Sequence, residues 1–252
     1  MNKLPQITLA FWIMKICATT LGETAGDLLS MTLDVGYLMS SLILISVFVV
    51  TLLTQLSSKR YNPALYWIVI LSTSTAGTTM SDFMDRTLGL GYAAGSAILV
   101  AILLAIFSVW YMSEKSLSVS RVTTLKAELF YWFAILFSNT LGTALGDFLA
   151  DDSGLGFAGG ALLIGSGIAV VAVLHYTTRL SSVALFWIAF VLTRPFGATL
   201  GDVLTKPHEK GGLDFGTAGS SMVLLSILVV LVGVAMFYHR KPAKAYAQVA
   251  DN

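Results

Sequence analysis

The sequence predicts an all-α membrane protein in which eight transmembrane helices form four two-helix repeats. Hydrophobic residues make up 56% of the 252 residues and charged residues only 12%, about half the charged fraction usual in soluble domains. An aromatic-Trp pair also occurs four times, each time with an aspartate fifteen residues after the tryptophan. Such recurrence at a fixed spacing is typical of an internal repeat. The whole chain, 1–252, is therefore expected to be a single integral membrane domain.

The eight spans are predicted from apolar runs long enough to cross a bilayer, which takes about 20 residues. They are expected at 7–29, 36–56, 64–84, 90–112, 128–149, 156–176, 183–204 and 216–238. Consecutive pairs form the repeats, at 9–60, 64–115, 128–180 and 183–240, and the linker 113–127 separates two halves. Because each repeat has an even number of spans, all four are expected to insert in the same direction, as parallel repeats with pseudo-symmetry about the membrane normal.

Loop charges predict the orientation in the membrane. The N-terminus, the loops between repeats and the C-terminal tail carry ten Lys and Arg residues, whereas the loops within repeats carry three. Basic residues favour the cytoplasmic side, so we expect both termini in the cytoplasm. The loops within repeats are acidic and would raise the cation concentration at the outer surface. Solubility of the loops is the alternative explanation.

Each repeated aspartate is expected to lie in the outer part of the bilayer. Fifteen helical residues span about 22 Å, and the tryptophan at the other end suits the cytoplasmic interface. A carboxylate at membrane depth is costly and indicates function. The predicted ion-binding or proton-relay residues are Asp27, Asp82, Asp147, Asp202 and Glu23.

Two further stripes accompany each aspartate. Small residues five positions and one position before it have the spacing that lets membrane helices pack closely. These predicted packing residues are Gly22, Gly26, Gly77, Ser81, Gly142, Gly146, Gly197 and Gly201. Threonines three, four and seven positions before the aspartate share its face and indicate a hydrophilic path. These predicted path-lining residues are Thr20, Thr24, Thr75, Thr78, Thr79, Thr140, Thr143 and Thr199. The first helix of each repeat is therefore expected at the centre of the bundle.

Two basic residues lie inside the predicted spans. Lys15 comes three residues after Trp12, so its side chain is expected to extend to the cytoplasmic interface. Arg194 lies deeper, and we expect it to act as a counter-charge to a carboxylate on a neighbouring helix. Pro195 is expected to kink or break the seventh span. Glycine and proline at this depth would also permit broken helices whose free carbonyl groups coordinate cations.

The sequence offers little support for other classes of function. HExxH, GxSxG, GxxxxGK[ST] and paired-cysteine motifs are missing, so we expect no enzyme activity. No Lys/Arg-rich tract indicates nucleic-acid binding. A single cysteine, Cys17, excludes an intramolecular disulfide. The three histidines are expected to be solvated residues at loops or helix ends, with a metal role for His208 and Glu209 as a minor alternative.

The recurrence of W-x14-D with T-x-G-x-x-x-[GS]-D resembles a family of bacterial membrane proteins built from a tandem two-helix repeat of unknown function. The resemblance covers about residues 9–240. The fourth repeat departs from the pattern, with Pro195 in place of the first threonine and a longer loop, and the second has Ser81 where the others have glycine. The resemblance implies an eight-helix fold, a location in a bacterial inner membrane and no particular activity.

The expected function is a cation transporter or channel whose intramembrane carboxylates bind the ion or exchange protons for it. Its partners are then the lipid bilayer and a small cation. Carboxylate and hydroxyl oxygens favour a bound divalent cation such as Mg²⁺ or Mn²⁺. The alternative is a non-transporting scaffold, sensor or regulatory subunit, which would have a sealed core. The ion, the direction, the oligomeric state and the convergence of the four aspartates on one axis or in two pairs remain open.

Overall fold

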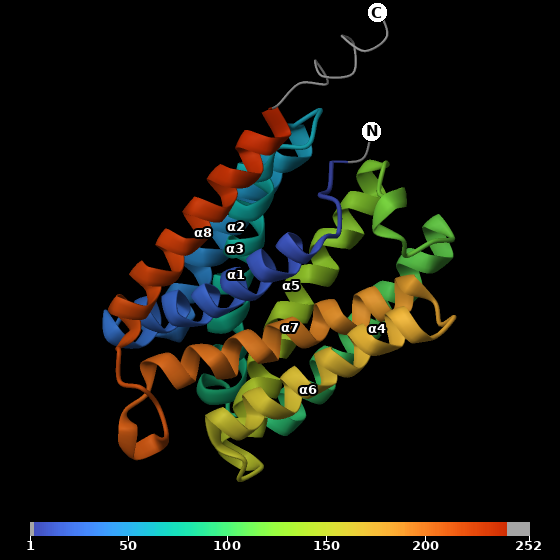
Figure 1. The fold of residues 1–252 in the computed structure, drawn as a ribbon. Coiled ribbons are helices and arrows are strands. Elements are labelled where there is room, and N and C mark those ends of the chain that lie inside the picture. Colours follow the sequence, from blue (N-terminus) through green and yellow to red (C-terminus); the bar gives the residue numbers. More distant parts are fainter. Residues whose placement is uncertain (1–2, 241–252) are drawn as a thin grey trace, which may run out of the picture.

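The computed structural model describes residues 3–240, which form eight α-helices and no strand. The helices are α1 Leu9–Asp27, α2 Tyr37–Ser57, α3 Pro63–Asp82, α4 Tyr92–Glu114, α5 Leu125–Asp147, α6 Gly156–Thr177, α7 Ser182–Thr205 and α8 Thr217–Arg240. Each predicted span agrees with one helix to within three residues at either end. The start of α1 and the end of α8 lie at the same end of the bundle (Figure 1). Residues 1–2 and 241–252, with the basic Lys241 and Lys244, lie outside the described residues.

Six of the described helices are long and apolar enough to cross a membrane: α2, α4, α5, α6, α7 and α8. The chain is therefore a multi-pass helical membrane protein. The helices α1 and α3 do not reach that apolar content because hydroxyl and charged side chains recur along both. Most of these side chains are buried against other helices, and a polar group in a membrane is tolerated where protein covers it.

The first helices of the four repeats form a closed ring. The helix α1 packs against α3, α3 against α5, α5 against α7, and α7 against α1. Within their apolar stretches, 72% of α5 and 56% of α7 is buried, against 17% to 22% of α2, α4, α6 and α8. The ring is thus the interior of the bundle, as expected, and the second helices form an outer layer.

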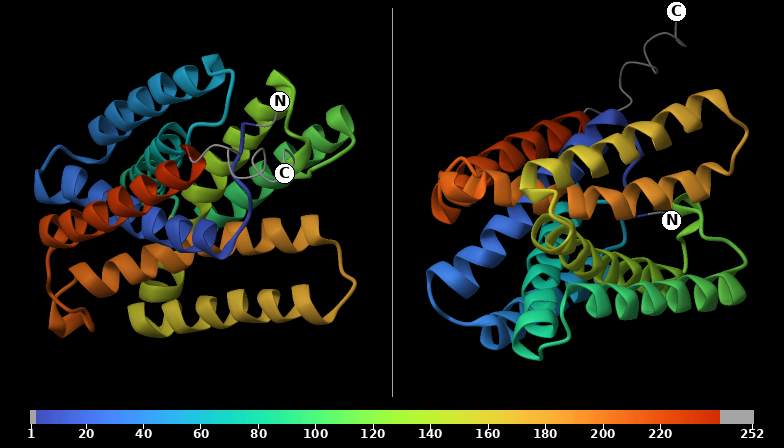
Figure 2. Two further views of the ribbon diagram at one scale, coloured as in Figure 1. Left: turned by 45° about the horizontal axis from the view of Figure 1, so that its top comes forward. Right: turned by 90° about the horizontal axis from the view of Figure 1, so that it is seen from below.

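Each outer helix packs mainly against the inner helix of the next repeat. The helix α2 lies on α3, α4 on α5 and α6 on α7, while α8 returns to α1. Figure 2 shows the α6–α7 pair side by side at one edge of the bundle. The last repeat therefore closes on the first, and every repeat covers the inner helix of its neighbour.

Small residues allow the inner helices to approach closely. A Cβ atom added at Gly77 would lie 2.9 Å from the backbone nitrogen of Thr140, on α5. One added at Gly26 would lie 2.9 Å from Cβ of Thr78, and one at Gly146 would lie 3.0 Å from Cβ of Ala198. These separations are shorter than carbon contacts allow, so each of these three glycines stands at a contact with the next inner helix.

The four aromatic-Trp pairs form a girdle at the end of the ring where the inner helices begin. The first aromatic residue of each repeat contacts the tryptophan of the next repeat. The ring centroids are 5.6 Å apart for Phe11–Trp67, 5.5 Å for Tyr66–Trp132, 6.1 Å for Tyr131–Trp187 and 5.7 Å for Phe186–Trp12. At most 5% of Trp67, Trp132 or Trp187 is exposed. These three tryptophans therefore contact protein instead of lipid, and their depth at the cytoplasmic interface stays a prediction.

A tyrosine pair inside this girdle gives a first test of the packing. The hydroxyl oxygens of Tyr66 and Tyr131 are 2.6 Å apart and both side chains are fully buried. Replacing Tyr66 with phenylalanine leaves the Tyr131 hydroxyl without this partner and should destabilise the protein by about 1–2 kcal/mol. Replacing both tyrosines should cost less than either single change, since Phe11 and Phe186 fill the equivalent positions. Thermal unfolding in detergent measures this, and additive losses would contradict it.

Candidate functional site

The four repeated aspartates lie at the far ends of the inner helices, opposite the aromatic girdle. Each is between 2% and 4% exposed. In the first three repeats, a five-residue π-helical turn begins directly after the aspartate, at Leu28–Thr32, Phe83–Thr87 and Phe148–Asp152. Such turns are rare and often occur at functional sites. In the fourth repeat, α7 instead continues to Thr205.

Two basic side chains divide the aspartates into two pairs. Arg86 lies 3.1 Å from Asp82 through Nε and 3.0 Å from Asp147 through Nη2. Lys206 Nζ lies 3.1 Å from Asp202 and 3.3 Å from Asp27. Each pair joins the aspartates of consecutive repeats, the fourth being joined to the first.

Arg86 and Lys206 occupy the same repeat position, four residues after the aspartate. Their side chains are 32% and 22% exposed, so they cover the aspartates from the surface. Burial alone would lower the pKa of Lys206, but the carboxylates of Asp202 and Asp27 raise it above its ordinary value, and the amine stays charged. Sequence reasoning treated both bases as loop charges. Each base follows an aspartate by four residues, a spacing that places both side chains on one face of a helix. This spacing could have predicted the two ion pairs.

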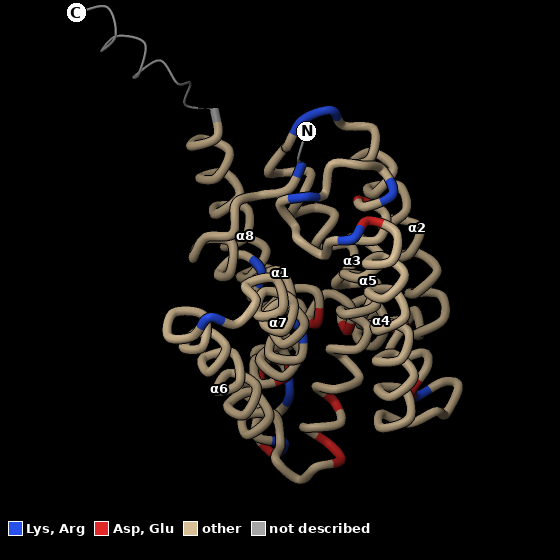
Figure 3. Tube along the Cα trace, turned by 90° about the vertical axis from the view of Figure 1, so that its right-hand side faces the viewer, with Lys and Arg blue, Asp and Glu red and all other residues tan. Residues whose placement is uncertain are grey.

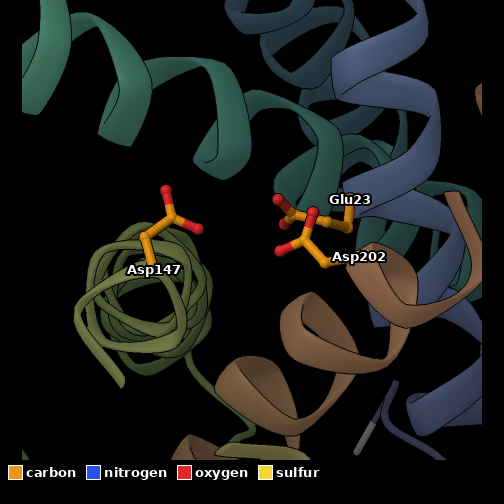
Figure 4. A group of neighbouring side chains, drawn as sticks. All are labelled: Glu23, Asp147 and Asp202. Carbon is orange, nitrogen blue, oxygen red and sulfur yellow. The ribbon is translucent and has the colours of Figure 1, made fainter. Parts of the chain in front are cut away.

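Carboxylates from three helices also converge beside these pairs. Figure 4 shows Glu23 of α1, Asp147 of α5 and Asp202 of α7 facing one another. One oxygen from each lies within 4.8 Å of the others. Oxygen ligands at this separation suit a hard cation such as Mg²⁺ or Ca²⁺. The structure thus brings these three predicted site residues together.

Arg194 lies about two helical turns before Asp202 on α7, toward the girdle, and is fully buried. Its Nη2 group lies 2.9 Å from Glu23 Oε2 and donates to the hydroxyls of Thr78 at 2.5 Å and Thr143 at 2.7 Å. These three partners occupy one repeat position, four residues before the aspartate, on the three other inner helices. In the fourth repeat this position is Ala198, which is small. The guanidinium group therefore lies near the centre of the ring. Arg194 is paired with a carboxylate on a neighbouring helix, as expected, and that carboxylate is Glu23.

Each inner helix carries an aspartate at the same repeat position near its far end, so the site is built from four copies of one sequence repeat. A comparison with known families finds the same four repeats. Four segments, 10–61, 65–116, 130–181 and 185–241, each match the family described as Repeat of Unknown Function (DUF347). The chain belongs to this family. Comparisons with curated proteins and with solved structures gave no match. The DUF347 description states no activity, so a function has to be inferred from the site.

The DUF347 repeats carry unequal charge at equivalent positions. Among the groups joined by the ion pairs at this end of the ring, five carboxylates, from the four aspartates and Glu23, face three bases, Arg86, Lys206 and Arg194. The buried Lys15 lies nearer the girdle and is not a member of these ion pairs. The difference leaves two formal negative charges in the cluster when every group is ionised. Two protons or one divalent cation would neutralise them.

Lys15 does not extend to the membrane surface, contrary to expectation. Its side chain is fully buried. The Nζ atom lies 3.3 Å from Asn139 Oδ1 and 4.3 Å from the centre of the Phe190 ring, and Asn139 in turn donates to Thr73 Oγ1 at 2.9 Å. Lys15 points into the ring, where side chains from α5 and α7 hold it by a hydrogen bond and a cation–π contact.

Pro195 lies inside α7 without ending it, since this helix is continuous over Ser182–Thr205. The predicted break is therefore wrong, because packing against α1, α5 and α6 holds the helix together. The other inner helices also run unbroken up to their aspartates. Broken helices with free carbonyl groups, which the sequence suggested, do not occur in the described inner helices, and the deviations are the π-helical turns.

The predicted threonine path is buried, and its hydroxyls have partners. Thr78 and Thr143 bind Arg194. The other six donate to carbonyl groups of the preceding turn in their own helices, a bond that membrane helices commonly make. They are Thr20, Thr24, Thr75, Thr79, Thr140 and Thr199. The structure thus brings two of the eight threonines to the charged cluster.

Proposed function

We propose that this protein is a cation transporter whose binding site consists of Glu23 and the four repeated aspartates. The observation that carries the proposal is the excess of two carboxylates over bases in a buried cluster built by all four repeats. A divalent cation, or protons exchanged for it, would neutralise this charge. Arg86 and Lys206 are partly exposed, so both can move aside when the ion binds.

The proposal places all eight helices across a bacterial inner membrane, with both termini in the cytoplasm. In support, basic residues predominate at the end of the bundle near the N-terminus (Figure 3), as expected for a cytoplasmic side. The inner helices α1 and α3 have 19 and 20 residues, close to the length that a bilayer requires, and the outer helices α8 and α2 pack against them. The aspartates would then lie nearest the outer surface.

Arg194 favours a transporter over an open channel. Its guanidinium lies between the aspartates and the girdle, near the centre of the ring. A cation moving along an open central pore would meet this fixed positive charge and be repelled. A mechanism in which the inner helices move, exposing the carboxylates to one side at a time, avoids that encounter.

The alternative is a non-transporting scaffold or sensor. Its support is that each of the four aspartates already has a basic partner, so the cluster could serve only to hold the repeats together. The two functions differ in whether removing the carboxylates abolishes a flux.

Ion flux into proteoliposomes tests the proposal, with monovalent and divalent cations and a pH-sensitive dye. Changing Asp27, Asp82, Asp147 and Asp202 to asparagine should reduce the flux to that of protein-free liposomes, because a neutral amide does not compensate the ion's charge. A second variant, with Arg86→Met and Lys206→Met added, avoids leaving those two bases unpaired. Thermal melts establish that both variants fold.

The matched control removes four exposed carboxylates from the loops that follow the inner helices. These are Asp34→Asn, Asp152→Asn, Glu209→Gln and Asp214→Asn. This control should retain a saturable flux, although a higher cation concentration would be needed to reach it if the acidic loops gather cations at the outer surface. A flux that survives in folded aspartate variants would refute the site, and the absence of flux from wild type under every condition would favour the scaffold.

A further inference from the structure

Residues 3–8 cross the end of the bundle that carries the aromatic girdle, and we call this segment the strap. Figure 1 shows it running from the N-terminus down to the start of α1. Leu4 is 7% exposed and belongs to the hydrophobic core. Lys3 Nζ donates to the carbonyl of Leu56 at 3.0 Å and to Glu128 Oε2 at 2.8 Å. The strap is therefore attached at its outer end to both α2 and α5.

The anchor for Lys3 is a buried polar group rather than a surface charge. Glu128 is 4% exposed and Gln55 is 1% exposed. Gln55 Nε2 lies 3.5 Å from Glu128 Oε1, while Gln55 Oε1 has no hydrogen-bond partner among the described residues. Lys3 itself is 18% exposed. The ion pair thus has one buried, fixed member and one partly solvated member that can leave.

A cavity of about 480 Å³, open to the surface, lies between the strap, the end of α8 and the starts of α1 and α3. The strap contributes Leu4, Pro5, Gln6 and Thr8 to its wall, and α8 contributes Ala235, Tyr238 and His239. Phe11, Met14 and Trp67 form its inner part, and the Phe11–Trp67 contact is one of the four contacts of the girdle. The cavity therefore extends from the strap to the girdle.

We propose that the strap is the gate at this end of the protein, held shut by Lys3 and Glu128. The proposal rests on the proposed transport function, since an ion released from the aspartates toward this end has to pass the girdle. The cavity beneath the strap already reaches the girdle. Because Glu128 is 4% exposed, releasing Lys3 leaves a buried carboxylate without its counter-charge, so this ion pair holds the strap in place and opening it costs free energy.

Thiol labelling tests the gate without relying on transport. Met14→Cys, in a Cys17→Ala background, places a reporter in the cavity wall, and a membrane-impermeant thiol reagent is added from the side of the termini. Lys3→Met should accelerate labelling at least about tenfold, as expected when a largely buried ion pair loses one member, and Glu128→Gln should act in the same direction. The exchange Lys3→Glu with Glu128→Lys should restore slow labelling, because Gln55 Oε1 can accept a hydrogen bond from the new lysine.

Two controls separate this proposal from general loosening of the fold and from the transport function. Lys59→Met removes an exposed lysine at the same end and should leave labelling unchanged. A reporter at Val171→Cys, buried between α6 and α7, should label equally slowly in all variants. Unchanged labelling of Met14→Cys in Lys3→Met, or acceleration that the charge exchange does not reverse, would overturn the gate. Faster labelling in a protein without flux would support the gate and refute only the transport proposal.

Discussion

Replacing Arg194 with methionine is expected to destabilise the protein by about 3–5 kcal/mol, the usual range for removing one member of a buried ion pair. The change leaves Glu23 without its buried counter-charge and removes the donor that Thr78 and Thr143 share. Because the guanidinium is fully buried, solvent cannot replace it. Equilibrium unfolding in mixed micelles measures the loss.

A second substitution shows whether charge is the cause. Glu23→Gln in the Arg194→Met background should recover most of the lost stability, because a neutral amide no longer needs a counter-charge. Glu23→Gln alone should be destabilising, since Arg194 would then be the unpaired charge. A double variant as unstable as the sum of the two single variants would show that Arg194 acts through packing and not through its charge.

Replacing Gly77 with alanine is expected to destabilise the protein by about 2–3 kcal/mol, as overpacking of a tight contact does. The added methyl group would lie 2.9 Å from the backbone nitrogen of Thr140 and 3.0 Å from the carbonyl carbon of Asn139. Backbone atoms cannot rotate out of the way, so α3 and α5 would have to separate. Thermal unfolding of the purified protein measures the change.

Gly233 in α8 provides the matched control for this substitution. A Cβ atom added there has no neighbour within 4 Å, so Gly233→Ala should be neutral or slightly stabilising through the higher helix propensity of alanine. Equal losses at both positions would mean that Gly77 matters for backbone conformation and not for close approach of the two helices.

The sequence alone predicted the helices and the central place of α1, α3, α5 and α7, because spacing encodes both. The Trp-to-Asp interval recurs without change, and small residues mark the same face each time. The packing of each outer helix on the next repeat could not be predicted, since the exposed surfaces of these helices are mostly apolar, with only scattered hydroxyl groups. Nothing in such a surface distinguishes one inner helix from another.

The sequence predicted the carboxylates of the site, but not the side chains that pair with them. Asp82 and Asp147 stood out by position, but the bridge between them comes from Arg86, whose place in a loop suggested solvation. Lys15 was assigned to the interface by its distance from Trp12, and the burial of the lysine depends on Asn139 and Phe190. Contacts between repeats of this kind depend on ring order, which the linear pattern does not contain.

The closure of the ring by α8 on α1 has a consequence for the origin of the protein. Each half of the chain supplies one bridging base, Arg86 in the first and Lys206 in the second, and each base reaches the aspartate of the following half. A half alone would leave one inner helix without its outer cover. Two copies of one half, assembled as a homodimer, would complete both the cover and the bridges. The present chain therefore has the architecture expected from duplication and fusion of a dimer-forming ancestor.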